Sequence, residues 1–375
     1  MVEDVQVRLS KYGEWICERT PSETWAYHLA SAQSLHLTGE LHTSVWNLPQ
    51  RVETFRSLMP LLANLAGHVL VPPEDLTVAD LLRGTGFRRI HVELTGRCNE
   101  RCLHCYSSSS PEVGASLDLA TILSIVDDAA SLGFPAIQFT GGDPLLSPHL
   151  VSAAAHAKVV GFNRIEVYTN GLALRRELLD QLAEFGVTFA LSVYSHDPSV
   201  HDGITQTPNS LERTLSAIRL LLERGCRTRV GVVIREDNHD DVDQLKAMLV
   251  KLGVPERSIT TGVERTAGRG SWDQSRTDDS INEHEHGGLR HGGLDGKVAV
   301  NYTGAVVPCI FDRGTILGYV SSSTSFKKVL NQRVSALRFQ HDEKFLKLIG
   351  TSLGCSECRV RHELFKHAKI EPALG

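Results

Sequence analysis

Strand-like and helix-like segments alternate along residues 88–265, and this alternation constrains the fold more than any other feature. The expected strands cover residues 89–95, 136–140, 164–169, 187–193, 228–234 and 258–263. Amphipathic helices are expected between them, at about 118–132, 147–161, 174–186, 209–225 and 239–253. Repeated βα units with short connections predict a parallel sheet, here rolled into an open barrel.

One helix start carries a chemical marker. Asn209 and Ser210 are residues of the capping type, and they stand just before the apolar periodicity that begins at Leu211. We therefore expect a helix to begin there.

Six of the eight cysteines fall in two groups, at positions 98, 102 and 105 and at positions 309, 355 and 358. The first group follows the first expected strand, at the edge where parallel barrels place their chemistry. Three closely spaced thiolates can bind three irons of a cubane iron–sulfur cluster and leave the fourth iron open to a small molecule. The alternative is a zinc knuckle, but zinc needs a complete tetrahedral set. The nearest further ligand, His104, lies inside the run and is badly placed to close that set.

Composition and charge narrow the class of protein. The 375 residues are too many for one compact core, so two or three domains are expected. A net charge of -5 disfavours a general nucleic-acid or anionic-membrane binder. The first residues do not read as a signal peptide, and no apolar stretch approaches the roughly 20 residues of a membrane span. We expect a protein of the reducing cytoplasm, without nucleic-acid or membrane partners, whose grouped cysteines bind metal rather than form disulfides.

Two further motifs end the second and third expected strands. Thr140-Gly141-Gly142-Asp143-Pro144 ends the second strand, and its glycines let the backbone approach a ligand closely because no Cβ is in the way. Tyr168-Thr169-Asn170-Gly171 ends the third. Because both motifs follow the cysteine run by successive βα units, they are expected to meet it at one edge of the barrel.

The C-x3-C-x2-C spacing after a first strand, with these motifs in this order, resembles the signature of radical S-adenosylmethionine (radical SAM) enzymes. The resemblance covers about residues 88–360 and implies an α/β fold with a partial, TIM-like (β/α)6 barrel. It implies a [4Fe–4S] cluster on Cys98, Cys102 and Cys105, whose open iron is chelated by the amino and carboxylate groups of SAM. In that family an electron from the cluster cleaves SAM to methionine and a 5′-deoxyadenosyl radical, which abstracts a substrate hydrogen.

The resemblance also assigns residues to bound SAM. These are His104, Tyr106, Gly141, Gly142, Asp143, Pro144, Asn170, Ser192 and Val233. The Gly-Gly-Asp-Pro motif holds the methionine amino group, and His104 lies against the adenine. Val233 can add a packing contact to the adenine, and the alternative is that Val233 belongs to the hydrophobic core. Ser192 faces the carboxylate or the ribose. Many relatives hold the carboxylate with an arginine shortly after His201-Asp202; here Thr205 or Gln206 stands in that region, and Arg213 is a possible substitute.

The second cysteine group resembles the SPASM/twitch extension of this family, which carries auxiliary iron–sulfur clusters. A hairpin is expected from the strand at Lys297 to the one ending at Cys309, and the extension is assigned to residues 266–375. Cys309, Cys355 and Cys358 can hold at most one auxiliary cluster. The alternatives are a cluster completed by His291, a cluster on the three cysteines with one open iron, or zinc on three cysteines and a histidine.

Residues 1–82 read as a separate unit, followed by the barrel over 83–265. Short strand-like segments precede amphipathic helical patterning there, which resembles the winged-helix peptide-recognition elements of peptide-modifying systems. The alternative is an N-terminal extension that caps the barrel.

Together these features predict a radical SAM oxidoreductase that cross-links or oxidises a ribosomal precursor peptide, whose leader the N-terminal domain binds. An external donor such as flavodoxin or ferredoxin is expected to supply the electron. One alternative is a dehydrogenase or epimerase of a small sugar or aminocyclitol. Another is a non-catalytic electron carrier, although a carrier has no use for a SAM pocket.

Overall fold

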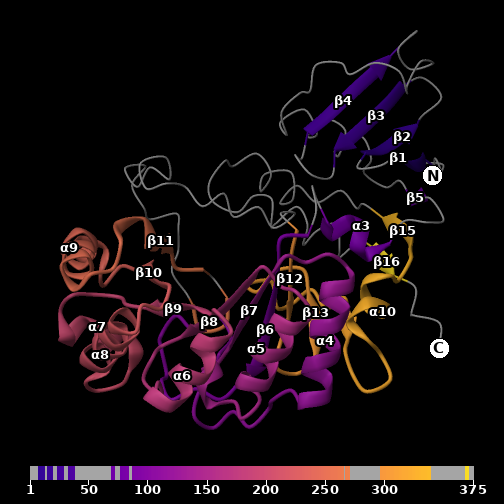
Figure 1. Ribbon diagram of the computed structural model, residues 1–375. Helices are drawn as coiled ribbons and strands as arrows, with labels where there is room; N and C mark the ends of the chain where they lie inside the picture. The colour runs from indigo at the N-terminus through magenta and orange to yellow at the C-terminus, as the bar shows by residue number, and fades with distance from the viewer. Residues whose placement is uncertain are drawn as a thin grey trace.

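The computed structural model describes residues 7–12, 15–19, 23–28, 33–38, 69–71, 77–83, 87–265, 267–270, 296–338 and 368–370. A nine-stranded sheet forms the barrel, and a seven-stranded sheet lies beside it (Figure 1).

The barrel sheet has the strand order β11-β10-β9-β8-β7-β6-β12-β13-β14. Its strands are β6 (Arg89–Thr95), β7 (Ala136–Gly141), β8 (Arg164–Thr169), β9 (Thr188–Ser192), β10 (Thr228–Ile234), β11 (Ile259–Val263), β12 (Lys297–Val300), β13 (Ala305–Val307) and β14 (Gly318–Tyr319). Strands β6 to β11 are parallel to their neighbours, which confirms the predicted βα barrel. Strand β12 pairs parallel to β6 and antiparallel to β13, so the expected hairpin is also confirmed.

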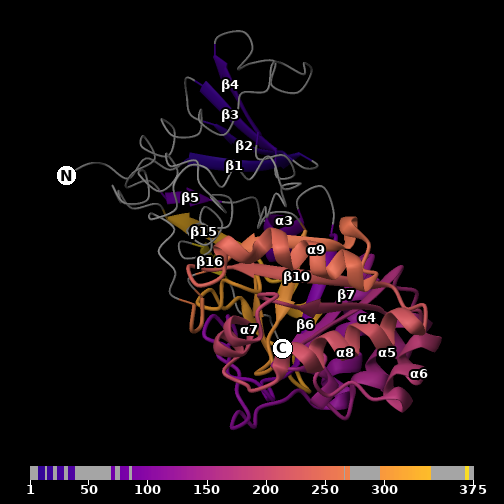
Figure 2. The same cartoon turned by 90° about the vertical axis from the view of Figure 1, so that its left-hand side faces the viewer.

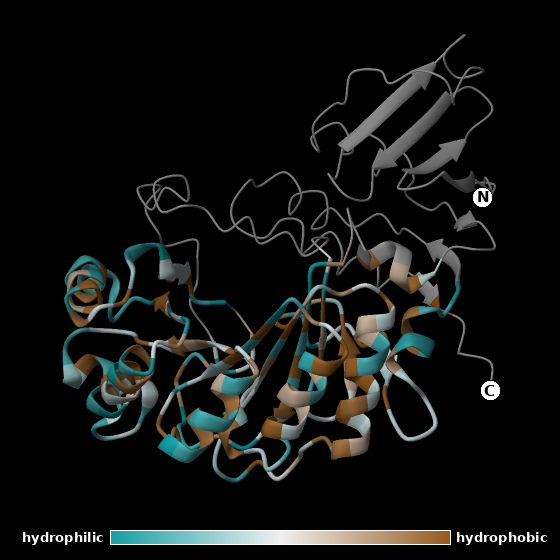
Figure 3. Ribbon diagram, viewed as in Figure 1, coloured by the Kyte–Doolittle hydropathy of each residue, from teal (hydrophilic) through white to brown (hydrophobic). Residues whose placement is uncertain are grey.

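Helices cover the outer face of this sheet. They are α3 (Val78–Arg83), α4 (Leu119–Ser131), α5 (Leu150–Val159), α6 (Arg176–Glu184), α7 (Pro198–Thr205), α8 (Ser210–Glu223), α9 (Val242–Leu252) and α10 (Phe326–Leu330). In Figure 3 the inner sides of these helices and the strands are largely brown, whereas the outer helical turns are largely teal. None of the described helices combines the length and apolarity needed to cross a lipid bilayer.

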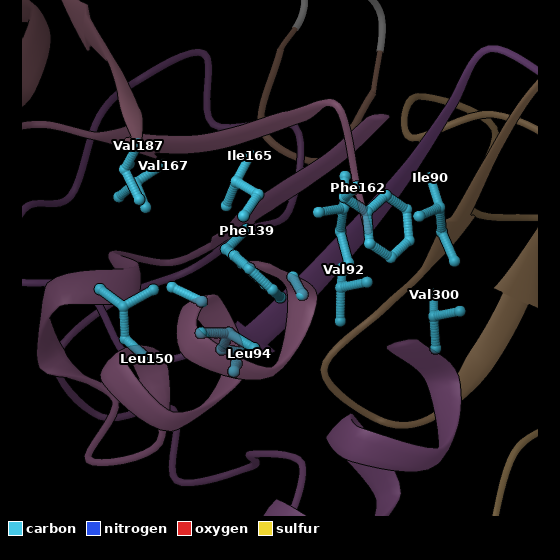
Figure 4. Close-up of a cluster of buried hydrophobic side chains, with 14 of the residues drawn as sticks. Ile90, Val92, Leu94, Phe139, Leu150, Phe162, Ile165, Val167, Val187 and Val300 are labelled. Carbon is cyan, nitrogen blue, oxygen red and sulfur yellow. The ribbon is translucent and has the colours of Figure 1, made fainter. Parts of the chain in front are cut away.

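Alternation along the strands explains where the core sits. Val92, Phe139 and Ile165 are almost fully buried on the outer face, against helix residues such as Leu150 (Figure 4). The residues between them point to the opposite face of the sheet because successive side chains alternate. The hydrophobic core therefore lies between sheet and helices.

The inner face of the barrel is polar. Its residues include His91, Glu93, Gln138, Thr140 and Glu166, each at most 8% exposed. Glu166 accepts hydrogen bonds from both Arg229 Nε (2.9 Å) and Arg229 Nη2 (2.7 Å), and Arg89 lies 3.4 Å away. Buried polar groups of this kind are stable only when they are paired.

Helix α8 begins at Ser210, as the capping residues predicted. Its cap differs from the expectation, because Asn209 has a left-handed backbone (φ 58°) and makes no side-chain cap. The carboxylate of Asp202 fills this role and accepts hydrogen bonds from the Leu211 backbone N–H (3.0 Å) and the Ser210 hydroxyl (2.8 Å). Asp202 thereby satisfies the free N–H groups at the helix start.

The second sheet joins the two ends of the chain. Its order is β16-β15-β5-β1-β2-β3-β4. The strands are β1 (Val7–Tyr12), β2 (Trp15–Arg19), β3 (Glu23–His28), β4 (Gln33–Thr38), β5 (Val69–Val71), β15 (Val334–Arg338) and β16 (Ala368–Ile370). Figures 1 and 2 both show β5, β15 and β16 between the antiparallel strands β1–β4 and the barrel. The helical patterning expected after β4 lies outside the described residues.

Candidate functional site

The cysteine loop follows β6 and is anchored at both of its sides. Backbone N–H groups of Gly96 and Cys98 donate to Ala115 O (2.9 Å) and Ser110 O (3.1 Å), so the loop folds back on itself. On the other side, Leu103 N donates to Ile204 O (2.9 Å) at the end of α7. The loop therefore has a defined shape without any disulfide.

Cys98, Cys102 and Cys105 are free thiols. Cys98 is buried and the other two are half-buried. Burial raises the pKa of Cys98 and of Cys102, and the nearby carboxylates of Asp143 and Glu100 raise it further. Thiolate is the form that binds metal, so in this setting the thiolates require a cation to stabilise them.

Two glycines bring the end of β7 against this loop. A Cβ on Gly141 would lie 2.3 Å from Thr95 O, and one on Gly142 would lie 2.2 Å from Arg97 O. The close approach allows Gly142 N to donate to Thr95 O (2.7 Å) and Asp143 N to donate to Arg97 O (2.9 Å). The structure thus brings the Gly-Gly-Asp motif and the cysteine run together.

Asp143 ties this corner to the next strand. It is fully buried, and its carboxylate accepts hydrogen bonds from Leu145 N (2.8 Å), Thr169 Oγ1 (2.7 Å) and Asn170 N (3.0 Å). Burial nevertheless raises the pKa of Asp143 to about 6. The carboxylate therefore fixes the ends of β7 and β8 relative to each other.

Asn170 extends from the end of β8 to the cysteine loop. Its Nδ2 donates to Asn99 Oδ1 (2.6 Å) and lies 3.8 Å from Cys98 Sγ. Hydrogen bonds to ligand sulfurs are one of the means by which proteins tune iron–sulfur clusters. Asn170 is placed to act on the first thiolate in this way.

His104 lies among aromatic rings on the other side of the loop. Its ring meets Tyr194 edge-on at 4.6 Å between centroids, and Tyr194 stacks on His201 at 5.4 Å. Burial, and then the charges of Arg235 and Arg269, lower the pKa of His104 to about 3, so its ring is neutral. Its Nδ1 is buried and has no hydrogen-bond partner among the described residues. A neutral ring with a free nitrogen is suited to contact a nucleobase.

Tyr106, on the other side of the third cysteine, lies near the inner face. Its hydroxyl is 3.5 Å from Thr140 Oγ1, and its ring meets Phe311 edge-on at 5.4 Å. The guanidinium of Arg313, from the connection between β13 and β14, lies over the Tyr106 ring at 5.9 Å and pairs with Glu93. The C-terminal hairpin therefore contributes a charge to the barrel interior, which the sequence analysis missed.

Ser192 and Val233 lie on the inner side of neighbouring strands. Ser192 Oγ donates to the Tyr168 hydroxyl at 3.3 Å. Val233 is half-buried and lies outside the hydrophobic core, unlike Val230 and Val232 on the same strand. This placement leaves Ser192 and Val233 available to a molecule inside the barrel.

The residues expected to replace the carboxylate-binding arginine have local partners. Thr205 Oγ1 hydrogen-bonds Ser210 Oγ (2.6 Å), and Gln206 Nε2 donates to Gly203 O. Arg213 donates from Nη2 to Leu172 O (3.2 Å). His201, of the His-Asp motif, accepts a hydrogen bond at Nδ1 from Tyr194 N (3.1 Å).

Only part of the expected auxiliary site is described. Cys309 is half-buried and follows β13. Cys355, Cys358 and His291 lie outside the described residues.

A family model for the radical SAM superfamily matches residues 92–249. These residues form a radical SAM domain. Three curated relatives of this domain are the AdoMet-dependent heme synthase of Methanosarcina barkeri (29% identical), the subtilosin biosynthesis protein AlbA of Bacillus subtilis (28%) and a PqqA peptide cyclase of Xanthomonas campestris (32%). The matches cover 43–44% of this chain and 36–48% of the relatives, so the chain spans less than half of the length of each.

Solved structures are similar to this chain in fold. Streptococcus suis SuiB bound to its precursor peptide SuiA has a TM-score of 0.53 at 13% identity and covers 72% of this chain and 74% of its own. Another SuiB structure, with a TM-score of 0.52 at 11% identity, covers 92% of this chain and 97% of its own. Native anSMEcpe with bound AdoMet and the Cp18Cys peptide has a TM-score of 0.51 at 13% identity, over 75% of this chain and 96% of its own.

The residues present fit the [4Fe–4S] cluster and SAM that radical SAM proteins use. Three free thiols share one anchored loop, and Glu100 Oε1 beside them is buried without a hydrogen-bond partner among the described residues. No three His, Cys, Asp or Glu side chains of the described residues converge on a point where one ion would be held. A cubane does not require such convergence, because each thiolate binds a different iron.

Proposed function

We propose that this chain is a radical SAM enzyme that cross-links or oxidises a ribosomally made precursor peptide. The observation that carries the proposal is the meeting of three free thiols, the Gly141–Asp143 backbone and Asn170 at the carboxyl edge of the barrel. One relative, AlbA, is named for biosynthesis of the bacteriocin subtilosin, and another is named a PqqA peptide cyclase, which supports a peptide as the substrate class.

When bound, the reduced cluster supplies one electron that cleaves SAM, and the resulting primary radical abstracts a hydrogen atom that acid–base side chains cannot remove. The chain's own residues hold and orient the reactants. Cys98, Cys102 and Cys105 would bind three irons, and the backbone of Gly141 and Gly142 would hold the methionine part of SAM.

The neutral ring of His104, which Tyr194 supports edge-on, offers a flat face for the adenine. Ser192 lies on the inner side for the ribose or the carboxylate. Correct placement matters because a primary radical reacts with whatever C–H bond is nearest. The buried inner face of the barrel excludes water from that reaction.

The flanking parts complete the proposal. Residues 1–82 would bind the leader of the precursor peptide, and residues 266–375 would carry one auxiliary cluster on Cys309, Cys355 and Cys358, with His291 as a possible fourth ligand. An auxiliary cluster suits net oxidation, because it can accept an electron from the substrate radical. A flavodoxin or ferredoxin of the reducing cytoplasm would supply the first electron.

The test uses the full chain, reconstituted without oxygen and reduced, with candidate short peptides whose reading frames lie beside its gene. A mass change in the peptide, accompanied by 5′-deoxyadenosine, supports the proposal, and the Cys102→Ala variant should produce neither. Release of 5′-deoxyadenosine without any change in the peptide would favour the small-molecule alternative. A cluster that never cleaves SAM would indicate an electron carrier.

A further inference from the structure

The segment Ala267–Gly270, which follows β11, is packed directly on the cysteine loop. Gly268 has a left-handed backbone (φ 59°), and a Cβ there would lie 2.3 Å from Cys105 O and 2.4 Å from Tyr106 O. Contacts this short to backbone atoms are impossible for any residue with a side chain. Glycine at this position therefore allows the contact between the segment and the loop.

Arg269 makes two hydrogen bonds to the same loop. Its backbone N donates to Cys105 O (3.0 Å), and its Nε donates to Cys102 O (2.9 Å). These two carbonyls belong to two of the three cysteines that would bind the cluster. The guanidinium is thus fixed against the backbone of the cysteine loop, since its Nε is held and its planar group cannot turn independently.

One terminal nitrogen of this guanidinium has no hydrogen-bond partner among the described residues. Nη2 of Arg269 is buried and has no hydrogen-bond partner there. A buried, charged donor without a partner is costly. Between the two cysteines whose carbonyls bind Arg269, the buried Nδ1 of His104 also has no partner among the residues described. Two buried groups without partners, at one end of one loop, mark a place that a polar ligand fills.

We propose that Arg269 binds the occupant of the cysteine site, with Nη2 donating to an anionic acceptor of the cluster–SAM pair. The acceptor is a carboxylate oxygen of SAM or a sulfur of the cluster, since both accept charge-assisted hydrogen bonds. The inference rests on the proposed function. Arg269 would also supply the cation that many relatives provide with an arginine after the His-Asp motif. Thr205 and Gln206, which stand in that region here, hydrogen-bond to other groups.

The Arg269→Gln variant separates binding from loop structure. The glutamine Nε2 takes the position of the arginine Nε and can still donate to Cys102 O. The variant lacks both the Nη2 donor and the positive charge. Arg269→Lys keeps the charge. The matched control is Arg176→Gln, which removes a charge from an exposed position on α6.

Each full-length variant is reconstituted without oxygen, and three quantities are measured: iron per chain, the dissociation constant of SAM per loaded cluster, and the midpoint potential of the SAM-free cluster. A rise of about tenfold or more in the SAM dissociation constant for Arg269→Gln, which is about 1.4 kcal/mol, supports the proposal with SAM as the source of the acceptor. An unchanged SAM affinity with a more negative potential supports it with the cluster as the source. Arg269→Lys should lie between Arg269→Gln and the wild type.

A purely structural role predicts the opposite ranking, because glutamine preserves the loop bond better than lysine does. Affinity and potential that match the wild type in Arg269→Gln, or a lysine variant weaker than the glutamine variant, overturn the proposal. A wild-type chain that takes up neither iron nor SAM contradicts the proposed function itself, which distinguishes the two failures.

Discussion

Replacing Glu166 with glutamine tests whether the polar inner face holds the barrel together. Glu166 is 1% exposed and lies between Arg229, which it binds through both carboxylate oxygens, and Arg89. Gln138 donates a further hydrogen bond. Arg229 also lies over the ring of Tyr168 at 5.1 Å, so the network extends toward Ser192 and the proposed SAM site.

The magnitude follows from the pKa of the carboxyl group. Burial alone would raise it, but the hydrogen bonds and charge of Arg229, with Arg89 and Gln138, outweigh burial and lower the pKa of Glu166 from 4.5 to about 2. Ionised Glu166 therefore stabilises the folded state by about 3 kcal/mol, at about 1.4 kcal/mol per pKa unit. Because the folded pKa lies below the unfolded one, this stabilisation is fully present above pH 4.5 and is lost as the pH falls toward 2. Glutamine lacks this stabilisation and leaves two half-buried guanidinium groups without their counter-charge.

Urea unfolding of the full chain, followed by far-ultraviolet circular dichroism, measures the effect. At pH 7 the Glu166→Gln variant should lose about 3 kcal/mol of unfolding free energy. Its difference from the wild type should shrink by about 1 kcal/mol when the pH is lowered to about 3.5. Glu184→Gln, at an exposed position on α6, serves as the control and should change little. A Glu166→Gln variant as stable as the wild type at pH 7 would refute the reasoning.

Three other changes probe the site. Gly142→Ala places a Cβ 2.2 Å from Arg97 O, so the end of β7 must shift by nearly 1 Å. The iron retained after reconstitution should therefore fall several-fold, and retention equal to the wild type would contradict the glycine argument. Asn170→Ala removes the donor 3.8 Å from Cys98 Sγ. The midpoint potential of the cluster should become more negative in an EPR titration, while the iron content stays unchanged. An unaltered potential would exclude a role of Asn170 in tuning the cluster. Cys309→Ala should lower iron from about eight to about four atoms per chain, as expected for loss of one cubane, with SAM cleavage preserved; unchanged iron would argue against the auxiliary site.

The barrel was predictable from sequence because its signals are local. Apolar residues that alternate along strands and recur along helices gave the expected elements, and β7 (Ala136–Gly141) and β10 (Thr228–Ile234) match the expected ranges closely. The cysteine run and the glycine motif were recognisable for the same reason, since each is a short continuous segment.

What the sequence did not predict depends on contacts between distant segments. Glu93 and Arg313 are 220 residues apart, and Arg269 reaches Cys102 across 167 residues. Strands β15 and β5 pair across the two ends of the chain. No local pattern encodes such pairings; the pair of small residues flanking Arg269, Gly268 and Gly270, was the nearest available signal.

The central claim is that three thiols leave one iron open to SAM, and cleavage of SAM by the reduced full chain tests it most directly. The measurement is 5′-deoxyadenosine formed per cluster, quantified by mass spectrometry after anaerobic reconstitution and reduction. The account predicts formation by the wild type and only background levels by Cys102→Ala. No 5′-deoxyadenosine from a wild-type chain with an intact cluster, or equal amounts from the variant, would contradict it.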